Sequence, residues 1–244
     1  MEKIIVEVDV RITLDYEITP DIIPKNYGRG FISLIKKLIE NTDQFLFNEF
    51  YNQHKLKPFT FGTYFPHLQG NANDKLKVGN VVKVNFSTSS IQLATNIYNG
   101  FLKTPKHFWQ NNESSIEFKP VKAFLNPNTI FRKNEHLFKT LSPFLINNEG
   151  NSNKFLLPGE DGFIEGLQFS LNECAKEFLG VDEKVEFEFE PVNMKMHVIY
   201  HYKKMPTNKG IFRMKAEPEI LQMIYDVGIG VHRSQGFGLL EVVK

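Results

Sequence analysis

Hydrophobic side chains occupy every even position from Ile4 to Leu14, and mostly charged residues lie between them. This period of two predicts a strand with one buried face, beginning at Lys3. Beyond Pro20 and Pro24 the spacing becomes helical, with lysines opposite the apolar stripe. The stripe consists of Phe31, Leu34, Ile35 and Leu38.

The rest of the first half alternates helical and strand patterns. Two further helices are predicted, and their N-caps are Thr42 or Asp43 and Ser89 or Ser90. The second of these helices has the apolar stripe Ile91, Ala94, Tyr98 and Phe101. Strands are expected from Phe59, over 79–88 and over 115–125, with a loop over 70–74. With adjacent helices counted as one, this is the β-α-β-β-α-β order of ferredoxin-like domains.

The second half roughly repeats that order after a boundary near Asn126-Pro127-Asn128. A hairpin is expected over 141–158, and a core-facing helix over 164–178 ends at Gly180. Strand patterns, a short helix, a glycine-rich turn and a last strand follow. The strand patterns lie over 185–190, 195–202 and 210–215. The sequence therefore predicts an α+β protein with two tandem ferredoxin-like (RRM-like) domains, residues 1–126 and 127–244.

Charge is unevenly spread along the chain, although the formal net charge is only +1. From residue 191 to the C-terminus, eight Lys or Arg residues stand against four Asp or Glu residues. A basic face on a near-neutral protein fits local binding of RNA. It also fits a solvated strand face, so charge alone leaves both interpretations open.

The chain contains one cysteine, Cys174, and no run of eighteen apolar residues. A single cysteine excludes an internal disulfide and suits a reducing compartment. Cys174 shares helical spacing with Leu167 and Leu171, which favours a core position over a reactive thiol. Because the apolar runs are too short to span a membrane, we expect a cytoplasmic protein without a membrane partner.

Four glycines form a symmetric pattern near the C-terminus, with five residues between the two pairs. They are Gly228, Gly230, Gly236 and Gly238. Glycines at alternate positions permit positive φ angles and the close approach of another backbone. Bare N–H groups in such a turn can bind phosphate oxygens, and His232 and Arg233 in its centre can meet phosphate or stack on a base. The alternative is a simple connection between two elements.

This glycine pattern, closed by a last strand, resembles the C-terminal signature of the RAMP superfamily. It is most similar to the sixth family of CRISPR-associated proteins, endoribonucleases that cut the repeat transcript into guide RNAs. The stretch Lys57-Pro58-Phe59-Thr60-Phe61 resembles a strand that these nucleases carry after a helix and a histidine-bearing loop. The Ser142-Pro143 pair resembles their middle region.

The resemblance implies a reaction that needs no metal or other cofactor. The 2′-oxygen of the RNA attacks the neighbouring phosphate and leaves 2′,3′-cyclic phosphate and 5′-hydroxyl ends. A protein group must take the 2′-proton, a cation must stabilise the phosphorane, and an acid must protonate the leaving oxygen. The implied partner is CRISPR repeat RNA. Other Cas proteins of an effector complex and a second copy of the chain remain open as partners.

The candidate catalytic residues are His54, Tyr51 and Lys57. The family carries its histidine about six residues before the lysine, where this chain has Tyr51. A loop of different length can bring His54 into place, the position can have changed to Tyr51, or the activity can be lost. The alternative for each residue is structural: a solvated loop histidine, a half-buried aromatic and an exposed lysine.

Basic residues along the C-terminal strands and beside the first helix are the candidate RNA contacts. They are Arg29, Lys195, Lys203, Lys204, Arg213, Lys215, His232 and Arg233, together with the four glycines. The first alternative function is a non-catalytic RAMP subunit that binds guide RNA. A phosphate-metabolite binder is weaker, because no Walker lysine-serine pair or Rossmann pattern follows a strand.

Overall fold

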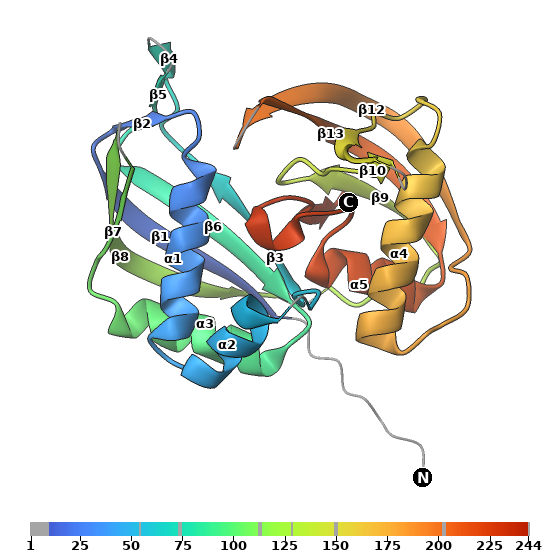
Figure 1. Ribbon diagram of the computed structural model, residues 1–244, viewed down its shortest axis with the longest axis horizontal. Coiled ribbons are helices and arrows are strands. Elements are labelled where there is room, and N and C mark those ends of the chain that lie inside the picture. Colours follow the sequence, from blue (N-terminus) through green and yellow to red (C-terminus); the bar gives the residue numbers. More distant parts are fainter. Residues whose placement is uncertain are drawn as a thin grey trace.

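The computed structural model describes residues 10–53, 55–72, 75–111, 114–127, 129–148, 151–201 and 204–243, without the side chains of residues 71, 72 and 151–153. Two halves lie side by side, each with helices packed on an antiparallel sheet, and the end of the chain lies between them (Figure 1). The α+β class and the two ferredoxin-like units are therefore confirmed. The division after residue 126 stays a prediction.

The N-terminal half contains a five-stranded sheet in the order β3-β6-β1-β8-β7. Its strands are β1 (Val10–Thr19), β3 (Phe59–Tyr64), β6 (Val81–Thr88), β7 (His107–Gln110) and β8 (Ser115–Asn126). The helices are α1 (Gly28–Glu40), α2 (Gln44–Asn52) and α3 (Ile91–Lys103). The even residues of β1 from Ile12 to Ile18 are buried, as the period of two predicts. Residues 3–9 of the expected first strand lie outside the described ranges.

The predicted helix caps are settled by two hydrogen bonds. The Asp43 carboxylate accepts from the Leu46 amide at 2.9 Å, and the Ser90 hydroxyl accepts from the Leu93 amide at 3.2 Å. The stripe expected on α3 is partly wrong, because Ile91 is 52% exposed. The buried face of α3 keeps Ala94 and Phe101 from the expected stripe, and Leu93 and Ile97 complete it.

A small three-stranded sheet extends from the N-terminal half, where a loop was expected. It consists of β2 (Ile22–Pro24), β4 (Gly70–Ala72) and β5 (Lys75–Lys77) in the order β2-β5-β4. Gly70 and Asn71 therefore lie in a strand. They pair with one edge of β5, and β2 pairs with the other edge. Asn73 and Asp74, the rest of the expected loop, lie outside the described residues.

The C-terminal half has a four-stranded sheet in the order β12-β13-β9-β14. Its strands are β9 (Glu135–Thr140), β12 (Phe187–Tyr200), β13 (Lys204–Ala216) and β14 (Leu240–Val242). The helices are α4 (Phe163–Leu179), α5 (Pro218–Val227) and the 3-10 helix η1 (Arg233–Gln235). The two expected strands over 185–190 and 195–202 form one long strand, which bends at a register shift between Pro191 and Asn193. Within the described residues, no helix combines the length and apolarity that a membrane crossing needs.

The first strand of this half is β9, and the expected hairpin over 141–158 is confirmed only in its inner part. The observed hairpin is shorter and consists of β10 (Asn147–Asn148) and β11 (Asn151–Phe155). Phe144 and Leu145 instead bridge to Asn208 and Val231. The segment after β9 therefore supports β13 and the glycine-rich turn.

Candidate nucleic-acid interface

The glycine-rich turn, residues 228–238, needs its four glycines for packing. Gly228, Gly230, Gly236 and Gly238 have φ angles of 89°, 76°, 93° and 79°. A Cβ on Gly230 would lie 2.3 Å from the Leu145 carbonyl oxygen, and one on Gly238 would lie 2.1 Å from that of Ile229. Another backbone approaches the turn too closely for any side chain at these positions.

Several backbone amides of the turn donate to carbonyl groups of the protein. The amide of Gly236 donates to Arg233 at 3.1 Å, and that of Gly238 donates to Pro143 at 2.9 Å. The amide of Val231 donates to Leu145 at 2.9 Å. The expectation that such amides hold phosphate therefore needs correction at Gly236 and Gly238, because each amide has one hydrogen to donate.

The turn also joins the two halves of the molecule. The Thr60 hydroxyl on β3 donates to the Phe237 carbonyl at 2.7 Å. Gly228 packs against the Thr60 side chain, and Gly236 packs against the Phe61 ring. The turn is thus an interdomain joint, and only its exposed side chains can meet a ligand.

The two basic residues at the centre of the turn, His232 and Arg233, lie in different environments. Arg233 is buried in the C-terminal half, where it donates to the Cys174 sulfur and lies 5.6 Å from the centre of the Phe178 ring. Arg233 also lines a cavity beside the turn, so its contact with RNA stays a prediction. His232 is exposed, and its backbone has a left-handed conformation with φ 58°.

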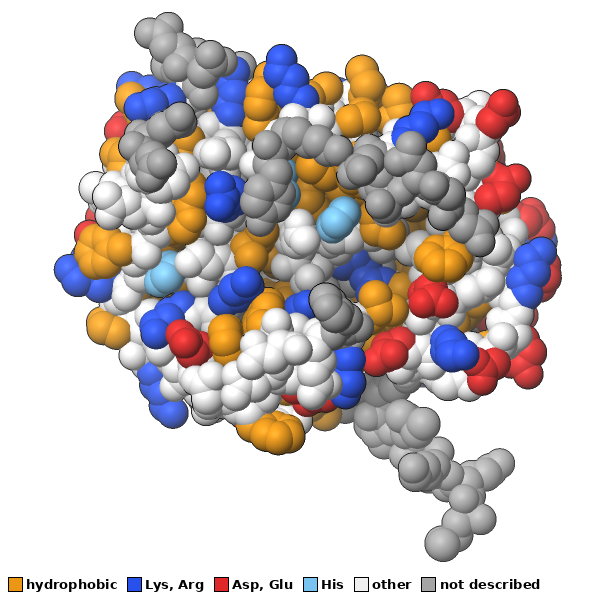
Figure 2. Space-filling view, in the orientation of Figure 1, with side chains coloured by type: hydrophobic (Ala, Val, Ile, Leu, Met, Phe, Trp, Pro, Cys, Tyr) orange, Lys and Arg blue, Asp and Glu red, His pale blue; other side chains and the backbone are white. Residues whose placement is uncertain are grey.

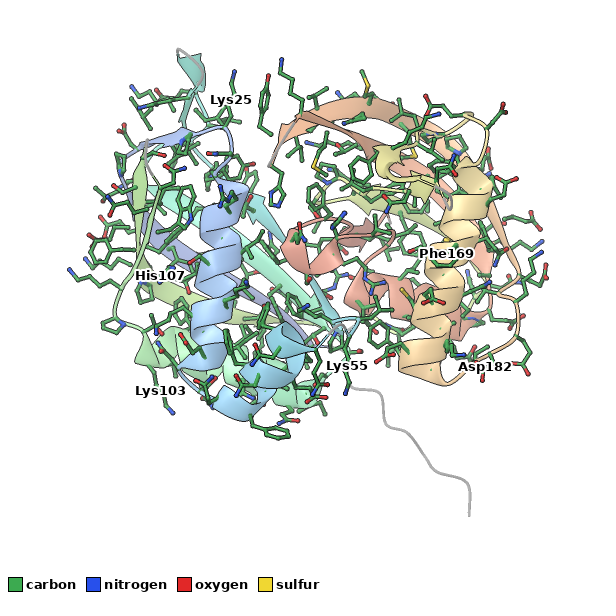
Figure 3. The ribbon with its side chains drawn as sticks, viewed as in Figure 1. Lys25, Lys55, Lys103, His107, Phe169 and Asp182 are labelled. Atoms are coloured by element: carbon green, nitrogen blue, oxygen red, sulfur yellow. The ribbon has the colours of Figure 1, made fainter. Side chains whose placement is uncertain are left out.

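One cavity of about 310 Å³ lies below η1, and we call it the lysine cavity. Its polar lining comes from the loop before β3, from α4 and from the turn, and it includes Lys55, Lys57, Glu173, His232 and Ser234. Lys55 lies at the lower end of the junction between the halves, and Phe169 lies on α4 across from it (Figure 3). The junction thus brings Lys57 and His232 to one cavity, although 174 intervening residues separate them.

Lys57 belongs to a cluster that also includes Lys36 and Tyr51. The two ammonium nitrogens lie 4.7 Å (Lys36) and 5.1 Å (Lys57) from the centre of the Tyr51 ring. Burial lowers the pKa of Lys57, and the charge of Lys36 lowers it further. Burial raises the pKa of Tyr51, so its phenol stays protonated. Sequence reasoning missed Lys36, which it placed on the polar face of α1. His54 lies outside the described residues.

A second cavity, of about 130 Å³, lies on the other side of η1, and we call it the hairpin cavity. Residues of β12 and β13 meet the start of α1 here, and the cavity is lined by four basic side chains: Lys25, His197, His201 and Lys209. Burial lowers the pKa of His201, whose Nε2 lies 3.1 Å from Gln235 Oε1. Gln235 lines both cavities, so they adjoin across η1.

Charge separates across this face of the molecule. Lys and Arg side chains lie on both sides of the junction, and acidic side chains gather along the outer margin of the C-terminal half (Figure 2). Among the other predicted contacts, Arg29, Lys195 and Lys204 are exposed. Lys203 lies outside the described residues.

Two predicted contacts are already ion-paired on the outer sheet surface. Arg213 pairs with Glu190 at 2.5 Å, and Lys215 pairs with Glu188 at 2.7 Å. Both carboxylates belong to β12. Because they neutralise the two cations, this surface keeps little positive charge to attract a polyanion. We therefore expect RNA along the junction and not along this surface.

The paired β-α-β-β-α-β halves, with the glycine-rich turn between them, form a fold similar to that of a solved RAMP protein. Residues 125–242 match the family described as "CRISPR associated protein Cas6, C-terminal". The C-terminal part of this chain is therefore similar to Cas6 proteins, and the fold of the whole chain is similar to the fold of solved Cas6-related and RAMP structures.

Solved structures share this fold over nearly the whole chain. One, described as a Cas6-related gene from Pyrococcus furiosus, has a TM-score of 0.83 and 18% identity, covering 97% of this chain and 99% of that one. An "RAMP protein binding different RNA substrates" has a TM-score of 0.80 and 19% identity over 96% and 100%. A "CRISPR associated protein Cas6" has a TM-score of 0.75 and 22% identity over 97% and 100%. No curated protein matches the sequence significantly.

Proposed function

We propose that this protein is a metal-independent endoribonuclease that cuts CRISPR repeat transcripts into guide RNAs. The Cas6 match over residues 125–242 and the fold shared with an RNA-binding RAMP protein support repeat RNA as the ligand. The observation that carries an enzymatic role is the environment of Lys57. It is partly desolvated against Tyr51, beside a second lysine, at the wall of a cavity at the junction.

The RNA strand runs along the junction, across η1, from the hairpin cavity to the lysine cavity. Lys25 and Lys209 bind its phosphates at the upper end, and the exposed Arg29, Lys195 and Lys204 extend this basic track. The four glycines contribute through the shape of the turn. Because these basic side chains hold the phosphates along the junction, one ribose of the strand lies in the lysine cavity.

In the reaction the 2′-oxygen bonds to phosphorus while the bond from phosphorus to the 5′-oxygen breaks. The Lys57 ammonium stabilises the phosphorane charge from a site that is partly shielded from water. A histidine takes the 2′-proton, and His54 is the residue that the resemblance implies. Tyr51 positions the ammonium groups of Lys36 and Lys57 over its ring.

The test is incubation of purified protein with the repeat RNA of its host in EDTA. A discrete cut with a 2′,3′-cyclic phosphate end supports the proposal. A matched RNA with 2′-deoxyribose before the cut should bind with similar affinity and stay intact, because it lacks the nucleophile. Cleavage of this deoxy substrate, or cleavage only with added metal, would contradict the mechanism.

A non-catalytic RNA-binding RAMP subunit is the second candidate. The observation that favours it is Tyr51, which stands at the family's histidine position and, with its pKa raised by burial, cannot act as a base near neutral pH. Tight binding of repeat RNA without any cut would establish this candidate. In either case we place the protein in the cytoplasm, with other Cas proteins or a second copy as further partners.

A further inference from the structure

His232 reaches the lysine cavity from the opposite half of the molecule. It lines that cavity together with Lys55 and Lys57, and its side chain is exposed there. The glycine-rich turn that carries it is fixed to β3 by the bond from Thr60 to Phe237. Since β3 begins two residues after Lys57, this bond joins the segment that carries Lys57 to the turn that carries His232.

The backbone at His232 is in a conformation that histidine rarely adopts. Among the described residues, His232 is the non-glycine residue with a positive φ, at 58° with ψ 26°. Such a conformation costs about 1–2 kcal/mol in a residue with a Cβ, and glycine or asparagine would adopt it more readily. Every other positive φ angle in this turn belongs to a glycine. A strained backbone that carries an exposed, chemically competent side chain points to a functional role.

We propose that His232 is the catalytic base of the ribonuclease, supplied by the glycine-rich turn to the cavity that holds Lys57. This inference rests on the proposed function and names the group that takes the proton. The imidazole accepts the proton of the 2′-hydroxyl as the new bond to phosphorus forms. The 5′-oxygen leaves with a proton from the Lys57 ammonium, so that proton count and charge balance.

The surroundings of His232 suit this role. Partial desolvation lowers the pKa of the imidazole, so the neutral, proton-accepting form prevails at neutral pH. The charged groups that face it are Lys55 and Lys57 from the loop before β3, Glu173 from α4, Arg233 in its own turn and His201 at the end of β12.

The experiment measures single-turnover cleavage of the repeat RNA at saturating protein, with affinity measured separately by gel shift. His232→Asn keeps a residue that tolerates the left-handed backbone and removes the base. We expect a rate about 10²–10⁴-fold lower, the usual contribution of a general base. In His232→Gly, which also fits the backbone, added free imidazole should restore part of the rate. The exposed His67 provides the control, because His67→Asn should cleave as the wild type does.

The outcomes separate this inference from the proposed function. If the wild type cleaves and His232→Asn cleaves at the same rate, while His54→Asn does not cleave, the inference is overturned and the function stands. The inference also fails if lower RNA affinity accounts for the whole effect of His232→Asn. If the wild type binds without cutting, the proposed function itself fails.

Discussion

The guanidinium of Arg11 on β1 lies 3.3 Å from the centre of the Tyr225 ring on α5, stacked on its face. The same guanidinium donates to the carbonyls of Tyr225 at 2.6 Å and Leu240 at 2.7 Å. Both carbonyls flank the glycine-rich turn. Arg11 therefore fastens the start of the N-terminal sheet to both ends of the segment that completes the C-terminal half.

Replacing Arg11 by alanine should destabilise the whole molecule. Two buried carbonyls lose their charged donor, and each such loss costs about 1–3 kcal/mol. We expect the free energy of unfolding to fall by at least about 2 kcal/mol in urea titration, with a slope that reports both halves unfolding together. The exposed Arg132 is the matched control, since Arg132→Ala should change the stability by less than about 0.5 kcal/mol. Equal effects for the two variants would show that Arg11 does not join the halves.

The sequence patterns predicted most of the N-terminal half because its strands and helices have one buried face. β1 buries Ile12, Leu14 and Tyr16 at period two, and α1 buries its stripe at helical spacing. The same reasoning missed β9, which is central in its sheet but buries only Phe138 and Thr140 completely. Its pairing with β13 and β14 depends on chain segments that are distant in sequence, and local patterns do not contain them.

Gly230→Ala should destabilise the protein as well as weaken RNA binding. The new Cβ would lie 2.3 Å from the Leu145 carbonyl oxygen, and the φ of 76° adds backbone strain. Gly159→Ala separates the two causes, because Gly159 has a φ of 89° but nothing within 4 Å of a Cβ. We expect Gly159→Ala to cost about 1–2 kcal/mol and Gly230→Ala clearly more. Comparable losses would mean that Leu145 moves aside easily.

The candidate site was predicted only in part. Lys57 was found because it stands in a recognisable strand motif, and His232 was noticed as a phosphate contact. Lys36 and Lys209 were missed, because neither lies in a motif and each joins the site only through the fold. The burial of Arg233 was not foreseen, since its sequence neighbours give no sign that it turns inward to Cys174 and Phe178.

Tyr51→Phe should leave cleavage within a few-fold of the wild-type rate. With its pKa raised by burial, the phenol is not a base, and phenylalanine keeps the aromatic face for Lys36 and Lys57. Tyr51→Leu removes that face and should slow cleavage more, and Lys57→Ala should cost about 10²–10³-fold in rate. Single-turnover rates at saturating protein test this order. A large loss in Tyr51→Phe would show that the hydroxyl itself takes part.

Stability should rise with pH between about 5 and 7. Burial lowers the folded-state pKa of five described histidines, His107, His136, His197, His201 and His232. An unfolded histidine has a pKa near 6.5, so below that pH the unfolded chain binds more protons than the folded one. The free energy of unfolding therefore increases with pH. The contribution of these histidines to stability is lost as the pH falls from 6.5 through their lower folded-state pKa values.

Urea titrations at pH 5.5 and 7.5 measure this change. His201→Gln should reduce it, because His201 is buried and glutamine can keep the bond to Gln235. His67→Gln, an exposed position, should leave the change as it is. An unfolding free energy that is independent of pH would contradict the lowered folded-state pKa values of these imidazoles.

The salt dependence of RNA binding should locate the interface. Each phosphate contact with a single strand contributes about 0.7 to the slope of log affinity against log salt concentration. Lys209→Gln and Lys25→Gln, both in the hairpin cavity, should each reduce that slope by about this amount. Lys215→Gln should not, because Glu188 already holds Lys215 at 2.7 Å on the outer sheet surface. If Lys215→Gln reduces the slope and Lys209→Gln does not, the RNA lies on that outer surface, and the lysine cavity is not its destination.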